Sequence, residues 1–384
     1  MSSIISLVQR VRTMQNPVEA KPLPDSKPIK FGILGAAAIA PSALIDPAKS
    51  HPEAVVYAVA ARSHDRAAAF AKKHNIEKVF GGPNGYQELI DSPEIDAIYN
   101  PLPNGLHYEW TMKALAAGKH VLLEKPAANT AEETRKMFEL ADHKGLVLLE
   151  AFHYRFHPVA NRVKAIIESG ELGPVKSTKT SLAIPRGIMK PDDIRFNYSI
   201  GGGALMDMGC YTINAMRYFA GVEPTSVLSV EHDLDSPQVD RKTVAKFALP
   251  GNITSTIFCD LAMPPALKII PQLPDINATI ECEKGRIQIM NYVMPTAYHS
   301  ITVTPTGKKS RVEKAYTFPD LGEPWWSSYR YQLEAFINKV KGRPPHVWVT
   351  KEDSIKNMEV IESVYAKSGL GSRPKSEYVP PSSE

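Results

Sequence analysis

The sequence has few cysteines, no long apolar run and only a small net charge. Its three cysteines, Cys210, Cys259 and Cys282, show no CxxC spacing, which argues against both a disulfide framework and a zinc site. We therefore expect reduced thiols, no metal and a cytoplasmic protein. No run of about 18 apolar residues occurs, so no membrane span is expected. The net charge is only +4 and the basic residues are scattered, which disfavours nucleic-acid binding.

The length of 384 residues favours two domains, preceded here by an extension, residues 1–28. The start of this extension contains Arg10 and Arg12 but no acidic residue. We interpret residues 1–18 as a short helix that packs on the protein. A mitochondrial transit peptide is the alternative, because such peptides are amphipathic and poor in acid. A proline-rich tether, residues 17–29, then leads into the first strand. Apolar residues recur at roughly helical spacing in the first part: Ile4, Ile5, Leu7, Val8 and Val11.

Residues 29 to 149 alternate between short apolar runs and stretches of helical pattern. Strands separated by helices of this length indicate βαβ units, a parallel sheet and helices on both of its faces. Ligands of such sheets bind at the carboxyl ends of the strands, so function is expected in the loops that follow them. The predicted strands are 30–34, 54–61, 96–100, 120–123 and 147–150, and the predicted helices include 65–74, 107–117 and 131–144.

The loop after the first strand, FGILGAAAIAPSAL, has the features of a dinucleotide-binding turn. Gly35 gives the backbone freedom that a tight turn needs, and a helix is expected to open near Ile39. The GxGxxG fingerprint becomes Gly35, Ala37 and Ala40, and the small Ala37 still lets a pyrophosphate approach the helix N-terminus. A strand–Gly–helix turn that binds nothing is the alternative. We assign Gly35, Ala37, Ala38 and Ile39 to a cofactor site.

The end of the second strand, AVAARSHDR, favours NADP over NAD. NAD enzymes usually carry Asp or Glu there for the ribose 2′-hydroxyl, whereas this strand ends at Arg62 and Ser63, with Arg66 one turn on. A guanidinium can pair with a 2′-phosphate, which a carboxylate would repel. Arg62 can also stack on the adenine. The alternative is a solvated basic residue at a helix start.

Motifs at and beyond the ends of later strands carry a family resemblance. They are NPLPNGLH (100–107), LLEKPAA (122–128), EAFHYRFHP (150–158) and GGGALMDMGCYTINAMRYFAG (201–221). In this order and spacing they resemble the Gfo/Idh/MocA family of oxidoreductases, from about residue 30 to about residue 369. The resemblance implies an α/β protein with a Rossmann domain, residues 29–150. A second α+β domain with a large open sheet, residues 151–384, would bind the substrate and form a dimer.

Lys125 is the first candidate catalytic residue. It ends a predicted strand and precedes a proline, which would point its ammonium into the crevice where a nicotinamide would lie. There it could stabilise an alkoxide or lower the pKa of a neighbouring acid. The alternative is a surface lysine in a turn.

Asp207 and Tyr211 are four residues apart on a predicted helix, 204–219, and so share one face. Most family members have histidine at the position of Tyr211. With tyrosine at this position, the sequence resembles the branch of the family that includes dimeric dihydrodiol dehydrogenase and NADP-dependent D-xylose dehydrogenase. That branch implies Tyr211 as acid/base, with Lys125 favouring its phenolate. Asp207 would position the substrate hydroxyl or Lys125. The alternative for Tyr211 is a core aromatic residue.

Other residues of these motifs complete the predicted site. Asn104 and His107 match the family's loop beside the nicotinamide ribose, although His107 could instead cap a helix. Pro101, Leu102 and Glu124 are assigned to the cofactor with them. Six polar residues are expected to face the substrate, and such residues suit a hydroxyl-rich molecule. They are equally typical of an interface between two domains. The six are His153, Tyr154, Arg155, Asp193, Arg195 and Asn197.

After residue 173 strands follow one another through turns, so a mostly antiparallel sheet is expected. Such an open sheet has to cover an apolar face, and the helices are too few to cover both faces. We therefore expect a homodimer through the outer face. The predicted strands are 175–184, 225–234, 243–249, 253–261, 278–283 and 286–290, and helices 327–341 and 351–367 end the chain.

The leading functional hypothesis is an NADP-dependent dehydrogenase that oxidises an aldose such as D-xylose at C1, or a trans-dihydrodiol. One alternative is an enzyme acting on another sugar or polyol. Another is a non-catalytic NADP-binding regulator, a type that loses the catalytic lysine within this family. The presence of Lys125 and Tyr211 favours an enzyme. The sequence does not distinguish the sugar, because aldoses differ by single hydroxyl orientations.

Overall fold

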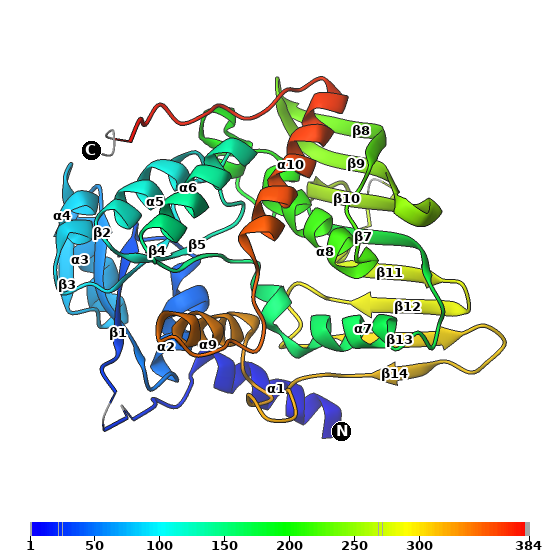
Figure 1. Ribbon diagram of the computed structural model, residues 1–384, viewed down its shortest axis with the longest axis horizontal. Helices are drawn as coiled ribbons and strands as arrows, with labels where there is room; N and C mark the ends of the chain where they lie inside the picture. The colour runs from blue at the N-terminus through cyan, green and yellow to red at the C-terminus, as the bar shows by residue number, and fades with distance from the viewer. Residues whose placement is uncertain (1, 22, 25, 268, 271, 381–384) are drawn as a thin grey trace.

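A computed structural model describes residues 2–21, 23–24, 26–267, 269–270 and 272–380, which form two sheets side by side (Figure 1). The first sheet has six strands in the order β3-β2-β1-β4-β5-β6. All neighbouring strands run parallel, as in a Rossmann fold. The predicted Rossmann architecture is therefore confirmed. The strands are β1 (Ile29–Leu34), β2 (Ala54–Ala61), β3 (Lys78–Gly81), β4 (Ala97–Asn100), β5 (His120–Leu123) and β6 (Leu148–Glu150).

Helices cover both faces of this sheet, because its strands are apolar on both sides. Helices α4, α5 and α6 pack on one face. Helices α2, α3 and α9 pack on the other, where the rings of Phe31 and Phe336 lie 5.7 Å apart. Because α9 comes from the far end of the chain, the first sheet is completed by residues beyond 150. The bounds are α2 (Asp46–Lys49), α3 (His64–His74), α4 (Gly85–Asp91), α5 (His107–Ala116), α6 (Ala131–His143) and α9 (Ser328–Val340).

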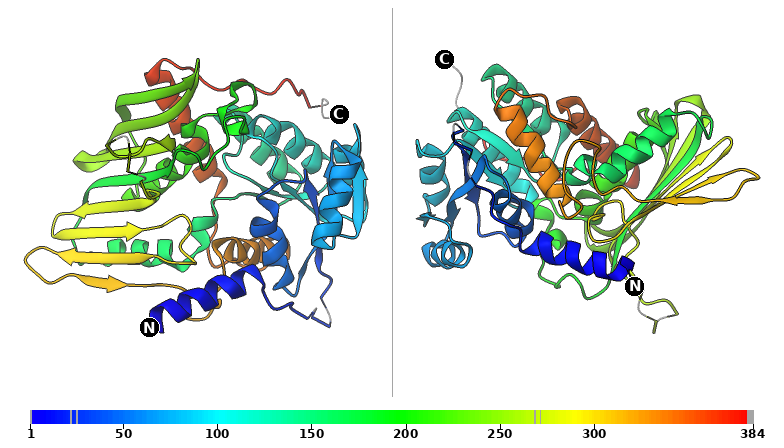
Figure 2. Two further views of the ribbon diagram at one scale, coloured as in Figure 1. Left: turned by 180° about the vertical axis from the view of Figure 1, so that it is seen from behind. Right: turned by 90° about the horizontal axis from the view of Figure 1, so that it is seen from below.

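The second sheet has eight strands in the order β14-β13-β12-β11-β7-β10-β9-β8. Only β7 and β10 pair in parallel, so the sheet is mostly antiparallel, as predicted. Helices α7 (Pro158–Glu168), α8 (Cys210–Ala220) and α10 (Lys351–Ser368) lie between it and the first half (Figure 2). The strands are β7 (Val175–Pro185), β8 (Ser226–Ser236), β9 (Val239–Leu249), β10 (Ile253–Met263), β11 (Asn277–Cys282), β12 (Gly285–Met290), β13 (Ser300–Pro305) and β14 (Arg311–Glu313).

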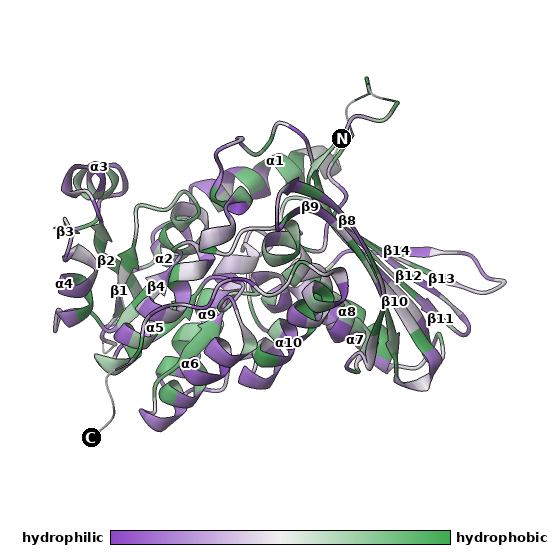
Figure 3. Ribbon diagram, turned by 90° about the horizontal axis from the view of Figure 1, so that it is seen from above, coloured by the Kyte–Doolittle hydropathy of each residue, from purple (hydrophilic) through white to green (hydrophobic). Residues whose placement is uncertain are grey.

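The outer face of this second sheet carries no helix among the described residues (Figure 3). Strand pairing places a row of polar side chains across it, all exposed or half-buried. The dimer was predicted on the ground that an apolar outer face has to be covered. Along this polar row that ground is wrong. The row consists of Thr302, Gln288, Thr279, Lys179, Thr256 and Lys246.

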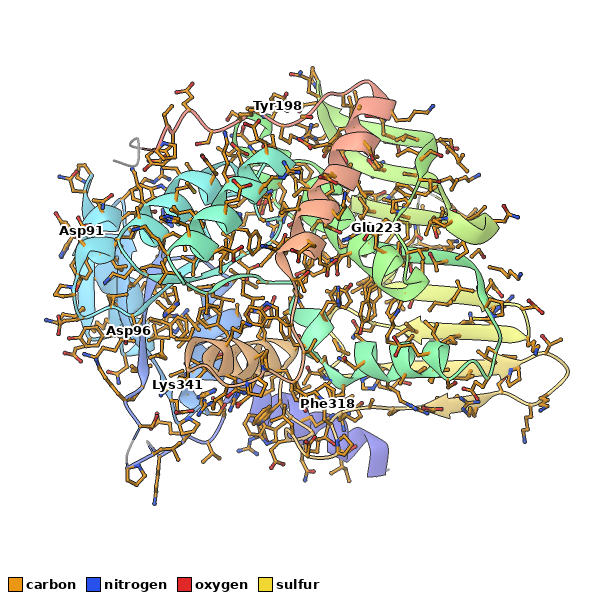
Figure 4. The ribbon with its side chains drawn as sticks, in the orientation of Figure 1. Asp91, Asp96, Tyr198, Glu223, Phe318 and Lys341 are labelled. Carbon is orange, nitrogen blue, oxygen red and sulfur yellow. The ribbon has the colours of Figure 1, made fainter. Side chains whose placement is uncertain are left out.

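The N-terminal extension packs against both halves of the protein. Helix α1 (Ser2–Gln15) places the Arg10 guanidinium 4.1 Å from the centre of the Tyr316 ring, and Arg10 donates a hydrogen bond of 3.2 Å to the carbonyl of Ala297. In the tether, the Ala20 N–H donates a 2.8 Å hydrogen bond to the Lys49 carbonyl of the first half, and Ser26 accepts a 2.7 Å hydrogen bond from Lys341, which follows α9 (Figure 4). The predicted helix is thus present and packed on the body. None of the described helices is long and apolar enough to cross a bilayer.

Candidate active site

A cavity of about 860 Å³ lies between the carboxyl ends of the Rossmann strands and the second half of the protein. Open α/β sheets bind their ligands in such crevices. Every residue that the sequence assigned to the cofactor lines this cavity, together with Ala36, Ala61, Tyr86 and Pro103, which were not predicted. The second half contributes Leu182, Ile194, Arg195, Ile200, Gly202, Gly203, Asp207, Met208, Tyr211 and Tyr329.

The turn after β1 forms one end of the cavity. Gly35 has a φ of +88°, and a Cβ there would lie 3.2 Å from the Leu102 side chain, so glycine suits this position on both grounds. A short helical segment, Pro41–Ile45, follows, two residues later than the start predicted near Ile39. Among the described residues, the backbone N–H groups of Ala37 and Ala38 make no hydrogen bond. They are therefore available to a pyrophosphate at the start of this helix.

The end of β2 supplies positive charge at the same end of the cavity. Arg62, Ser63 and Arg66 all line it and are exposed. The Ser63 hydroxyl caps α3 by accepting a 3.4 Å hydrogen bond from the Arg66 backbone N–H. The two guanidinium groups thus stand at the start of a helix, which also favours an anion. This arrangement fits the 2′-phosphate of NADP.

The loop after β4 connects the cofactor end to the second half. His107 is fully buried, and its ring nitrogens lie 2.9 Å from the Pro126 carbonyl and 2.7 Å from the Leu102 carbonyl. Its side chain therefore joins two strand-end loops and does not cap α5. Burial lowers the pKa of His107 to about 4, although the carbonyl oxygens of Pro126 and Leu102 beside its ring nitrogens act in the opposite direction. Asn104 donates a 3.0 Å hydrogen bond to the carbonyl of Gly201.

Lys125, two residues after the end of β5, lines the cavity. Its ammonium donates to the Asp207 side chain at 2.8 Å and to the Asp207 backbone carbonyl at 2.9 Å. Burial alone would lower the pKa of Lys125, but Asp207 outweighs it and raises the pKa. The preceding Glu124 is also buried and accepts a 2.8 Å hydrogen bond from Tyr99. Lys125 is therefore a fixed cation.

Asp207 lies in a π-helical turn, Leu205–Gly209, that leads into α8, where the sequence predicted one regular helix. Arg195 donates to its second carboxylate oxygen at 2.8 Å. Burial would raise the pKa of Asp207, but Lys125 and Arg195 together hold it well below its usual range. Asp207 is thus an ionised carboxylate whose two oxygens are held by different cations.

Tyr211, in the first turn of α8, lines the cavity beside this pair. The Lys125 ammonium lies 4.9 Å from the centre of its ring. Burial, followed by the neighbouring Tyr329, raises the pKa of Tyr211 well above its usual value. This direction is opposite to the lowering expected from Lys125, because burial of the phenol has the larger effect on the pKa of Tyr211. Tyr211 makes no hydrogen bond to another described residue through its hydroxyl.

The three polar residues after β6 do not line the cavity, contrary to expectation. His153 is buried behind Tyr211 and lies 2.8 Å from the Ser328 hydroxyl through Nδ1. Tyr154 donates a 2.7 Å hydrogen bond to Asn214, and Arg155 pairs with Asp353 at 2.6 Å. Each is thus bonded to a residue outside the cavity, Ser328, Asn214 or Asp353, so we leave all three out of the substrate site.

Of the three polar residues before the glycine run, only Arg195 lines the cavity. Asp193 accepts a 3.0 Å hydrogen bond from the Arg195 guanidinium, and Asn197 accepts one from the Ser199 hydroxyl at 2.8 Å. Asp193 and Asn197 therefore support the segment and are not placed to contact a substrate. No group of three or more His, Cys, Asp or Glu side chains among the described residues is arranged to hold a metal ion.

Tyr329 is the main site residue that the sequence did not predict. It stands in the first turn of α9, lines the cavity, and stacks on His153 with ring centres 4.0 Å apart. Nothing in the sequence around it distinguishes it from other helix tyrosines. It enters the site only because α9 folds back onto the Rossmann sheet.

Comparison with known proteins places the chain in a family. Residues 29–152 match the oxidoreductase family with an NAD-binding Rossmann fold, and residues 160–288 match the GFO/IDH/MocA C-terminal domain. The chain belongs to the Gfo/Idh/MocA oxidoreductase family. The resemblance stated from the sequence is therefore confirmed, as is the expectation of an oxidoreductase.

Three relatives illustrate what the chain is similar to. It is 33% identical over 346 residues to D-xylose 1-dehydrogenase (NADP(+)) 2 of Haloferax volcanii, covering 89% of this chain and 98% of that protein. It is 30% identical over 241 residues to trans-1,2-dihydrobenzene-1,2-diol dehydrogenase of Macaca fascicularis, covering 62% of this chain and 66% of that protein. A 3-ketoreductase from Actinomadura kijaniata, solved with NADP and TDP-benzene, has 28% identity and a TM-score of 0.74, covering 89% and 98%.

Proposed function

We propose that this oxidoreductase uses NADP to transfer hydride to or from a carbinol or carbonyl carbon of a sugar, polyol or trans-dihydrodiol. The observation that carries the proposal is one cavity that is lined both by Arg62 and Arg66, which follow β2, and by Lys125, Asp207 and Tyr211. The names of the xylose and dihydrodiol dehydrogenases among its relatives support the substrate class. NAD is the less favoured cofactor, because no carboxylate at the end of β2 lines the cavity.

The cofactor fits the residues at its end of the cavity. The free N–H groups of Ala37 and Ala38 suit the pyrophosphate, and Arg62 with Arg66 suits the 2′-phosphate. When bound, NADP supplies the hydride acceptor, or the hydride donor in its reduced form. The loop residues Pro101, Leu102 and Asn104 lie between the phosphate end and Lys125 and would border the nicotinamide ribose.

Tyr211 is proposed as the acid/base of the reaction. In reduction its hydroxyl gives a proton to the substrate oxygen, and in oxidation it takes one. Lys125 stands beside it as a cation and stabilises the negative charge that develops on that oxygen. Asp207 holds the lysine in place, since both of its oxygens are already bonded to cations.

The substrate end of the cavity combines these polar groups with apolar walls. Leu182, Ile194, Ile200 and Met208 line it, and Tyr329 offers a ring and a hydroxyl. A cyclic molecule with one apolar face and one hydroxyl-bearing edge fits such a lining. A second candidate is a ketosugar attached to a nucleotide, which the solved 3-ketoreductase complex with TDP-benzene favours.

We infer further that the enzyme is a homodimer and resides in a reducing compartment such as the cytoplasm. The outer face of the second sheet supports the first inference only in that no described helix covers it, since the row of side chains across it is polar. The three cysteines, which are free and buried, support the second.

The test is a rate screen at 340 nm with NADP and with NAD over a panel of aldoses, cyclic polyols and trans-dihydrodiols. The reduced cofactor is then tested with ketosugars, free and attached to dTDP. Turnover of an aldose or dihydrodiol with NADP supports the proposal. Turnover of the dTDP-linked ketosugar alone selects the second candidate. Absence of turnover with bound NADP would favour a regulator.

A further inference from the structure

Asp207 is held between two cations that come from different halves of the protein. Lys125 of the Rossmann half donates to Oδ1 at 2.8 Å, and Arg195 of the second half donates to Oδ2 through Nε at 2.8 Å. The Lys125 side chain is 13% exposed and the Asp207 side chain 15% exposed. At such burial a charge interacts more strongly than at the surface, so each cation matters for the carboxylate.

Arg195 is itself fixed at several points. Its Nη1 donates to Asp193 at 3.0 Å, and its carbonyl accepts a 2.8 Å hydrogen bond from the Gly203 backbone N–H, shortly before Asp207. The same segment is attached to the C-terminal part of the chain, where Tyr198 (Figure 4) donates a 3.1 Å hydrogen bond to the Ser372 carbonyl. The guanidinium is therefore positioned before any substrate arrives.

A carboxylate held from one side only can turn toward its remaining partner. Without Arg195, Oδ2 of Asp207 would be free to rotate toward the lysine or to accept a hydrogen bond from substrate. The Lys125 ammonium would keep its 2.9 Å bond to the Asp207 backbone carbonyl but lose the fixed carboxylate partner that sets its direction beside Tyr211. Shifts of about 1 Å in such groups can cost about 100-fold in rate.

We propose that Arg195 is a positioning residue: acting through Asp207, it fixes the Lys125 ammonium where the substrate oxygen develops its charge. This inference rests on the proposed function, in which Lys125 and Tyr211 serve one substrate oxygen. It assigns to Arg195 a role in turnover, whereas the sequence had suggested substrate binding. Asp193 supports Arg195 from the far side of the guanidinium.

The kinetic test compares Arg195→Met and Arg195→Ala with Arg186→Met and Arg186→Ala. Arg186 is an exposed arginine on the same segment and does not line the cavity. We expect the Arg195 variants to lose about 100-fold in kcat, with little change in KM or in the Kd for NADP. Guanidinium ion added to Arg195→Ala should restore part of kcat and should not affect Arg186→Ala. A rise in KM alone, or an unchanged kcat, would overturn the proposal.

A measurement without turnover separates this proposal from the proposed function. Carbon-13 NMR of aspartate carboxyl groups, assigned with Asp207→Asn, follows the ionisation of Asp207 directly. In Arg195→Met the pKa of Asp207 should rise, and in Arg186→Met it should not. A folded Arg195→Met protein with an unchanged Asp207 titration contradicts the inference whatever the enzyme's substrate. A shifted titration in a protein that turns over no panel substrate would leave the electrostatic link standing and refute only the proposed reaction.

Discussion

The ammonium of Lys125 lies 4.9 Å from the centre of the Tyr211 ring, over its face. It is bonded at the same time to Asp207, so its charge is shared between a carboxylate and an aromatic ring. A cation in this place attracts the ring and stabilises negative charge on a nearby oxygen. Burial nevertheless raises the pKa of Tyr211, so the lysine does not make the tyrosine a stronger acid than a free phenol.

The first prediction concerns pH. Oxidation needs Tyr211 as a phenolate and reduction needs it as a phenol. Since burial raises the pKa of Tyr211, the phenol persists at neutral pH. Oxidation rates should therefore rise with pH without a plateau below about pH 10, and reduction rates should stay level from about pH 6 to about pH 9. Initial rates in both directions test this. A plateau of oxidation near pH 7 would show that Lys125 lowers the pKa after all.

The second prediction concerns cofactor choice. Arg62→Ala should raise the Kd for NADP by roughly 10- to 100-fold, because a hydrogen bond to a charged group contributes about 1.5–3 kcal/mol. The loss is smaller than for a buried pair, since Arg62 is exposed. Binding of NAD, which lacks the 2′-phosphate, is the internal control and should not change. An unaltered Kd for NADP on calorimetric titration would place the phosphate elsewhere.

The sequence predicted the Rossmann strands well, because buried parallel strands appear as nearly continuous apolar runs. The predicted strands 54–61 and 120–123 have the bounds of β2 and β5. Strand β3 was missed, since this edge strand has four residues, begins with a lysine and ends with a glycine. Strand β14, a three-residue edge strand of the other sheet, was missed for the same reason, and its six-residue neighbour β13 was missed as well.

The site was predictable where it depends on strand ends. The carboxyl ends of parallel strands meet at one edge, so loops far apart in sequence could be assigned to one crevice. Tyr329 could not be assigned, since its place depends on how α9 docks on the first sheet. The direction of a side chain within a turn was equally hidden: His153 and Tyr154 follow a strand end, yet both point into the seam. Arg195 was predicted as a contact for substrate, and its bond to Asp207 required coordinates.

The third prediction concerns stability. Asp240 and Arg373 form an ion pair of 2.8 Å with both side chains fully buried, next to the glycine run. Arg373→Met should lower the free energy of unfolding by about 3–5 kcal/mol, because it leaves a buried carboxylate without its cation. Arg135→Met, at an exposed pair with Glu359, should cost no more than about 1 kcal/mol. Denaturant unfolding of both variants checks this, and equal losses would contradict it.

The fourth prediction concerns assembly. If two copies meet through the outer sheet face, Thr256 lies inside the interface, and strand pairing places it between Lys179 and Lys246. Thr256→Lys adds a third cation and should shift the protein from dimer to monomer. Asn84→Lys, at an exposed position of the Rossmann half, should have no effect. Analytical ultracentrifugation at micromolar concentration measures both. A monomeric wild type would disprove the dimer.

The most direct test of the account is the turnover of Tyr211→Phe with NADP and the best substrate of the panel. The change keeps the ring and its packing, so unfolding and the Kd for NADP should match the wild type. Turnover should fall by about 10²–10⁴-fold, the usual loss for a positioned acid/base. Lys125→Met should act alike, and the double variant should be little worse than either single one. Near-normal turnover of Tyr211→Phe would show that the tyrosine only packs and that the proton passes elsewhere.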